Sequence, residues 1–132
     1  MEKQLRIPSN ISYIKEIEKL VDELASEINI DNSIYGNFLI SLIEAVNNSI
    51  IHGNKQNENK YVNIVISNND QELKVIVEDE GDGFDYKNLP DPTNPDNIQK
   101  VNGRGIFLMQ KLSDKCEFLD NGSKVELKFN LQ

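Results

Sequence analysis

The sequence is poor in cysteine and histidine, the residues that supply thiol and imidazole chemistry. It has one cysteine, Cys116, and one histidine, His52, among 132 residues. A single cysteine excludes a disulfide within the chain and any site with several cysteine ligands. Because only one histidine is available to activate the thiol, and Cys116 alternates with Phe118 in a strand pattern, we interpret Cys116 as a buried strand thiol rather than a nucleophile.

Positive charge is also scarce. Lys and Arg total 14 against 22 Asp and Glu, which gives a formal net charge of −8. The chain therefore lacks a broad basic face for a nucleic-acid backbone, and we expect no direct nucleic-acid partner. No apolar run approaches the ~18 to 20 residues of a membrane span, and residues 1–8 lack the apolar core of a signal peptide. These absences predict a soluble, cytoplasmic protein with no membrane partner.

The length allows one folded unit. At ~100 to 200 residues per domain, 132 residues with 38% apolar content form one domain around one core. We therefore expect a single domain over residues 1–132, without a second catalytic or scaffold domain.

Hydrophobic periodicity predicts the order of the elements. A short strand at residues 3–7, which Pro8 ends, precedes a helix that begins at Ser9 or Asn10 and runs to Ile28. A second helix follows from Asp31 or Asn32 to Gly53. The remaining elements are a hairpin (61–67 and 72–78), an irregular stretch (79–102), a third helix (103–112) and a closing hairpin (115–119 and 123–131). This order predicts an α+β two-layer sandwich, with a mostly antiparallel mixed sheet covered on one face by helices.

The second predicted helix carries one polar stripe. A turn of 100° per residue places these side chains on one face: Asn37, Ser41, Glu44, Asn48 and His52. One interpretation is a solvated face, and the other is a site, which would justify the poor helix formers Asn47 and Asn48 in mid-helix. As a site, Glu44 would orient a hydroxyl or water for attack on phosphorus, and the Asn48 oxygen suits Mg²⁺. His52 is either a ligand or a capping and packing residue.

Two glycine-containing segments follow. Asp79 ends a strand and precedes Gly81 and Gly83, which would let the backbone approach a flat ligand while Asp79 accepts a hydrogen bond from an exocyclic amine such as that of adenine. The alternative is an acidic turn. Residues 103–105, Gly-Arg-Gly, open the third helix, where backbone N–H groups favour an anion. Phosphate-loop and dinucleotide-binding motifs are absent.

Taken in order, three segments resemble the N, G1 and G2 boxes of the Bergerat-fold (GHKL) ATPases. They are Glu44-Ala-Val-Asn-Asn48-Ser-Ile-Ile-His52-Gly53, Asp79-Glu-Gly81-Asp-Gly83-Phe84 and Gly103-Arg104-Gly105-Ile106-Phe107-Leu-Met. Within that superfamily the chain is most similar to the bacterial anti-sigma-factor serine/threonine kinases. The resemblance covers nearly the whole chain, and three ordered boxes are more specific than any one of them.

The resemblance implies a role for each matching residue. Glu44 matches the general base, Asn48 the magnesium ligand and Asp79 the reader of the adenine amine. The other implied ATP-binding positions are His52, Gly81, Gly83, Phe84, Lys100, Gly103, Arg104, Gly105, Ile106, Phe107 and Ser123. Ser123 stands where the family has a threonine that supports the aspartate. Residues 85–102 would form the ATP lid, and Lys100 or Arg104 would supply charge near the γ-phosphate.

The implied function is an ATP- and Mg²⁺-dependent kinase. It would phosphorylate a serine or threonine of an anti-sigma-factor antagonist, sequester a sigma factor, and form a homodimer through its first strand, with partners near the first helix. An alternative keeps ATP as a switch for partner binding without phosphoryl transfer. A third possibility is the catalytic domain of a histidine kinase, which would need a separate phosphoacceptor chain because the chain has only His52.

Overall fold

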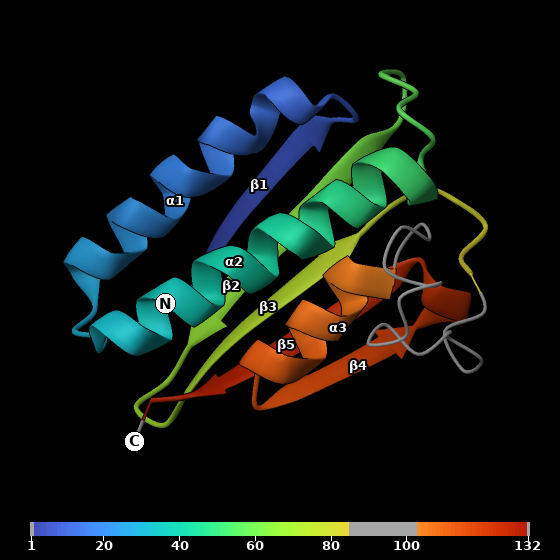
Figure 1. Ribbon diagram of the computed structural model, residues 1–132. Helices are drawn as coiled ribbons and strands as arrows, with labels where there is room; N and C mark the ends of the chain where they lie inside the picture. The colour runs from blue at the N-terminus through green and yellow to red at the C-terminus, as the bar shows by residue number, and fades with distance from the viewer. Residues whose placement is uncertain (1, 85–102, 132) are drawn as a thin grey trace.

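A computed structural model describes residues 2–84 and 103–131. The five strands it describes form one antiparallel sheet in the order β1-β2-β3-β5-β4, and helices α1, α2 and α3 lie side by side on one face of it (Figure 1). The strands are β1 (Glu2–Pro8), β2 (Tyr61–Asn68), β3 (Glu72–Glu78), β4 (Lys115–Leu119) and β5 (Lys124–Asn130), and the helices are α1 (Ile14–Glu27), α2 (Asn32–Asn48) and α3 (Gly103–Leu112). The predicted α+β two-layer fold is confirmed, but the described strands pair only antiparallel and do not form the mixed sheet that was expected.

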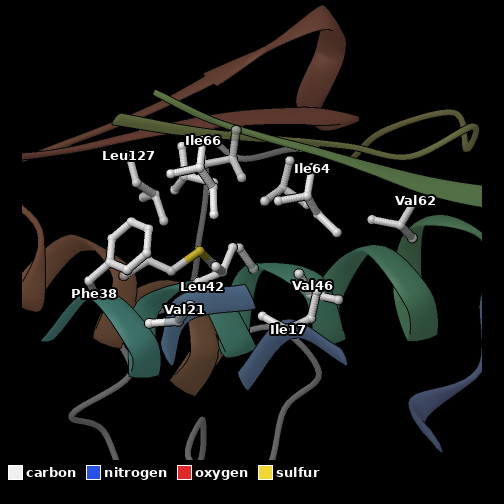
Figure 2. Packing of buried hydrophobic residues seen from close by; sticks show 14 of the residues in the cluster. Ile17, Val21, Phe38, Leu42, Val46, Val62, Ile64, Ile66 and Leu127 are labelled. Carbon is white, nitrogen blue, oxygen red and sulfur yellow. The ribbon is translucent and has the colours of Figure 1, made fainter. Parts of the chain in front are cut away.

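The core lies between the sheet and the helices. Alternate residues of β2, β3 and β5 point at the helices, and Figure 2 shows Val62, Ile64, Ile66 and Leu127 opposite Phe38, Leu42 and Val46 of α2 and Ile17 and Val21 of α1. All of these side chains are fully buried. Phe38 of α2 also packs edge-on against Phe129 of β5, with ring centroids 5.2 Å apart. The strand alternation and helical spacing of the sequence therefore both point at this core.

The structure differs from the prediction at two element boundaries and in the type of one helical turn. The Asn10 side chain accepts a hydrogen bond from the Ser12 amide and caps a 3₁₀ turn, η1 (Ile11–Tyr13), so α1 begins at Ile14 rather than near Ser9. The second helix reaches Gly53 as predicted, but its last turn, η2 (Ser49–Gly53), has π-helical hydrogen bonding. In the last hairpin a 3₁₀ turn, η4 (Asp120–Gly122), precedes β5, which begins at Lys124.

The continuous helix Asn32–Gly53 is long and apolar enough to cross a membrane by length and composition alone. It is also the central core helix, and Phe38, Leu42, Val46 and Ile50 are fully buried in the fold. The core helix of a soluble protein passes the same test, so this helix is weak evidence for a membrane span.

Cys116 lies partly buried on β4 and packs against the core. Burial raises the pKa of its thiol to about 11. The thiol is therefore protonated near neutral pH, in agreement with its interpretation as a packing residue.

Candidate nucleotide-binding site

A pocket opens where the end of the second helix meets the end of β3 and the β4–β5 connection. Four segments contribute its walls: the α2–η2 helix, the β3 end with the residues after it, α3, and the β4–β5 connection. The lining residues are Ala45, Asn48, Ser49, His52, Gly53, Val77, Asp79, Gly83, Phe84, Met109, Phe118, Gly122, Ser123 and Val125. A mostly apolar concave site with a few polar groups is typical of a small-molecule pocket.

Asp79 is the acidic residue that lines this pocket. Its carboxylate accepts a hydrogen bond from the Gly81 amide at 2.8 Å. Burial raises the pKa of the Asp79 carboxyl, and the Gly81 amide and the Ser49 hydroxyl act against that rise. A carboxylate has about four acceptor positions. Asp79 therefore keeps acceptor capacity for a donor on a ligand.

Two glycines make room for this carboxylate. A Cβ atom at Gly53 would lie 2.2 Å from Asp79 Oδ2, and one at Gly81 would lie 2.1 Å from the Gly53 carbonyl oxygen. The backbone at Gly53 therefore packs closely against the backbone at Gly81, and the Asp79 carboxylate lies beside this contact. Any side chain at Gly53 would displace the carboxylate.

Gly83 and Phe84 are held by the turn between β4 and β5. The Phe84 amide donates to the Asn121 carbonyl oxygen at 2.9 Å. Gly83 has φ +85°, and a Cβ atom there would lie 1.9 Å from that same oxygen. The Phe84 ring packs edge-on against Phe118 of β4, with ring centroids 5.2 Å apart. These two rings form an apolar wall of the pocket.

The polar stripe of α2 faces α3 and the pocket rather than solvent. Ser41 is fully buried, and a Cβ atom at Gly105 would lie 2.9 Å from Glu44 Oε2 and 3.4 Å from Asn48 Nδ2. The interpretation as a solvated face is therefore wrong. Asn48 lines the pocket, and Glu44 lies beside it against the first turn of α3.

His52 lines the pocket from η2. Burial lowers the pKa of its imidazole, so the neutral form is favoured near neutral pH. A neutral ring offers one donor and one acceptor to a ligand.

The remaining predicted site residues divide into two groups. Arg104 is exposed, Ile106 is fully buried in the core and Phe107 is partly buried, and none of the three lines the pocket. Gly103 opens α3, and Lys100 and the predicted lid (85–102) lie outside the described residues.

Ser123 lines the pocket, but its hydroxyl donates to the Asp120 carbonyl oxygen at 2.9 Å. Its contact with Asp79 is through the backbone, because the Asp79 amide donates to the Ser123 carbonyl oxygen at 2.9 Å. The expectation that the Ser123 hydroxyl supports Asp79 is wrong in this structure. Ser49 provides the supporting hydroxyl instead.

Sequence reasoning did not assign Ser49 or Gly53 to the site. Both lie within the first of the three boxes, but Ser49 is one position from the polar stripe and Gly53 has only the role of a helix stop in the sequence pattern. Their spacing from Ala45 could have indicated a shared face, since residues four and eight positions along a helix lie on nearly the same side. Ala45 also lines the pocket.

The donor set around Asn48 suits a magnesium ion that is shared with a ligand. The described residues include no cluster of three or more His, Cys, Asp or Glu side chains able to hold a metal. Mg²⁺ commonly takes one or two protein oxygens and completes its shell with phosphate oxygens and water. Asn48, with its amide at the pocket wall, fits that arrangement.

Residues 7–129 match the family described as the histidine kinase-like ATPase domain. This chain belongs to that family. The resemblance inferred from the three boxes is thus confirmed, and family membership supports an ATP-binding domain.

The chain is also similar to individual proteins. It is 27% identical over 119 residues to the serine-protein kinase RsbW of Staphylococcus aureus, covering 85% of this chain and 75% of the relative. The structure of the RsbU and RsbW domains of a Mycobacterium tuberculosis protein superimposes with a TM-score of 0.68 at 13% identity, over 100% of this chain and 32% of that one. The histidine kinase domain of a blue-light activated histidine kinase from Erythrobacter litoralis has a TM-score of 0.54 at 20% identity, over 95% of this chain and 62% of the other. The two structures show the fold, and this chain spans about a third of the length of the first.

Proposed function

We propose that this protein is an ATP-dependent serine/threonine kinase that phosphorylates an anti-sigma-factor antagonist and sequesters a sigma factor. The observation that carries the proposal is Asp79, a carboxylate with spare acceptor capacity inside a pocket whose glycines leave no room for other side chains. Such a group suits the exocyclic amine of adenine. The similarity to the serine-protein kinase RsbW supports transfer to a hydroxyl. The protein would act in the cytoplasm, as a homodimer through β1.

Glu44 is the proposed general base. Its carboxylate lies beside Asn48 and the first turn of α3, next to the pocket. It would accept the proton of the acceptor hydroxyl as that oxygen bonds to the γ-phosphorus and the bond to the β-phosphate oxygen breaks. Asn48 would present its amide oxygen to magnesium. An ion held there would supply positive charge to the phosphate oxygens.

The test is transfer of label from γ-labelled ATP with Mg²⁺ into a lysate of the source organism, with ATP binding measured separately. Glu44→Gln keeps the shape of the side chain and removes the base, so we expect ATP binding to stay within about twofold and transfer to fall at least 100-fold, the lower bound of the usual general-base contribution. Loss of ATP binding in the same variant would make Glu44 a structural residue or a metal ligand.

One observation favours a second function, nucleotide-gated partner binding without transfer. Glu44 Oε2 packs against Gly105, so the carboxylate is placed to anchor α3 as well as to act on a substrate. In that case ATP binding would shift the position of α3 and the partner surface beside it. If no lysate protein acquires label while the protein still binds ATP, the result would support this alternative.

A further inference from the structure

Asn54 follows the π-helical turn and is one of the few polar residues buried in the described part of the chain, at 2% exposure. Both polar atoms of its side chain are hydrogen-bonded. Nδ2 donates to Ser9 Oγ at 2.9 Å and to the Tyr61 carbonyl oxygen at 3.0 Å, and Oδ1 accepts from the Glu80 amide at 2.8 Å. The three contacts join the end of β1, the start of β2 and the loop after β3.

Glu80 is the residue directly after Asp79, and it is held at two points. Its amide donates to Asn54, and its carboxylate accepts from the Tyr61 amide at 2.5 Å. The amide bound by Asn54 belongs to the peptide unit that joins Asp79 to Glu80. Asn54 therefore fixes the backbone immediately next to the Asp79 side chain.

The other side of Asp79 is fixed independently. The Asp79 amide donates to the Ser123 carbonyl oxygen, which ties it to the start of β5. Loss of the Asn54 contact would leave Asp79 anchored on the β5 side, while the Glu80 backbone would be held only through the contact of its side chain with the Tyr61 amide and could shift. Because the Gly81 amide holds Asp79 Oδ1, such a shift would rotate the carboxylate.

Asn54 itself does not line the pocket. Any effect on a ligand must therefore pass through the loop that it holds. Ser9 lies on the other side of Asn54 from Glu80: its hydroxyl accepts from Asn54 Nδ2 and donates to the Lys60 carbonyl oxygen. The chain thus offers a buried polar neighbour of Asn54 as a matched control.

We propose that Asn54 is a positioning residue for base recognition: by holding the Glu80 amide, it sets the orientation of Asp79 and so the preference for a 6-aminopurine nucleotide. The inference rests on the proposed function, in which Asp79 accepts a hydrogen bond from the adenine amine. A site built around one hydrogen bond rejects a ligand that lacks the matching group, provided that the acceptor is well oriented.

The experiment compares the dissociation constants of ATP and inosine triphosphate, which carries a carbonyl oxygen in place of the 6-amino group. For Asn54→Ala we expect ATP affinity to fall about tenfold, the effect of one lost hydrogen bond to a charged group, while inosine triphosphate affinity changes less than twofold. Ser9→Ala should lower the melting temperature yet keep the wild-type ratio of the two constants. In an Asp79→Asn background, Asn54→Ala should leave the ratio unchanged.

An equal loss of affinity for both nucleotides in Asn54→Ala, or an unchanged ratio, would overturn the inference. Where Asn54→Ala does not fold, Asn54→Ser provides the same test, because its hydroxyl can bond Ser9 while its shorter side chain withdraws the acceptor from Glu80. A wild-type protein that binds ATP with a preference over inosine triphosphate, together with a normal ratio in Asn54→Ser, contradicts this inference and leaves the proposed function standing. A wild-type protein that binds neither nucleotide overturns both.

Discussion

The two ends of the pocket are built by different means. At the end that holds Asp79, backbone amides and closely packed glycines from distant segments fix one carboxylate. At the other end, Glu44 and Asn48 project from consecutive turns of one helix against Gly105 of α3. The first end depends on tertiary contacts and the second on helical spacing. We therefore expect base recognition to be lost when the packing around Asp79 is disturbed. Catalysis should be lost when a single side chain of the helix is replaced.

The largest effect is expected at Gly53. Gly53→Ala places a methyl group 2.2 Å from Asp79 Oδ2, so the carboxylate must move, and we expect ATP affinity to fall more than 100-fold, the upper part of the range for one lost hydrogen bond to a charged group. Isothermal titration measures this change. Gly36→Ala is the matched control in α2, where nothing lies within 4 Å of the added Cβ atom. It should stabilise the fold by about 0.5–1 kcal/mol and leave ATP binding unchanged, and a similar ATP affinity in the two variants would contradict the close packing at Asp79.

An intermediate effect is expected at Gly105, on the opposite end. Gly105→Ala brings a methyl group 2.9 Å from Glu44 Oε2, which is the mobile end of a side chain and can move aside. We expect phosphoryl transfer to fall about tenfold, since a small displacement of a catalytic group is costly, while ATP affinity changes less than threefold. Transfer kinetics and titration on the same preparation separate the two effects. If ATP affinity falls by a larger factor than the rate of phosphoryl transfer, Glu44 contributes to ligand binding rather than to the transfer step.

The smallest effect is expected from His52. Burial lowers the pKa of its imidazole, so below the unfolded-state value of about 6.5 the unfolded chain binds more protons than the folded one. The free energy of unfolding should therefore decrease as pH falls through about 6.5, and His52→Gln should reduce that decrease. Urea titrations of both proteins at pH 7.5 and 5.5 measure it. An identical pH dependence would show that His52 titrates equally in both states.

Much of the fold was predictable because it depends on local patterns. Alternation in residues 61–67 and 72–78 specified which strand faces are buried, and the helical spacing of Phe38, Leu42 and Val46 specified the core face of α2. The start of α1 was missed because Asn10 caps a 3₁₀ turn as readily as an α-helix. The same capping pattern is compatible with either element.

The site was predictable where it depends on one helix or one motif. Glu44, Asn48 and His52 share a face by spacing alone, and the pocket position of Asp79 follows from a strand that ends before glycines. The support of Asp79 was not predictable, because Asn54 contacts residues 26 and 45 positions away. The Ser49 hydroxyl replaced that of Ser123 for the same reason, since tertiary packing decides which hydroxyl reaches the carboxylate.

The account depends most directly on Asp79 as the reader of the base. The decisive measurement is the affinity of wild type and Asp79→Asn for ATP and inosine triphosphate, with the melting temperature of each protein. Because burial raises the pKa of the Asp79 carboxyl, the ionised group opposes folding at neutral pH, and the neutral amide should keep or raise the melting temperature. The account predicts that wild type prefers ATP and that Asp79→Asn loses this preference while staying folded. Equal affinities for the two nucleotides in wild type, or an intact ATP preference in Asp79→Asn, would contradict it.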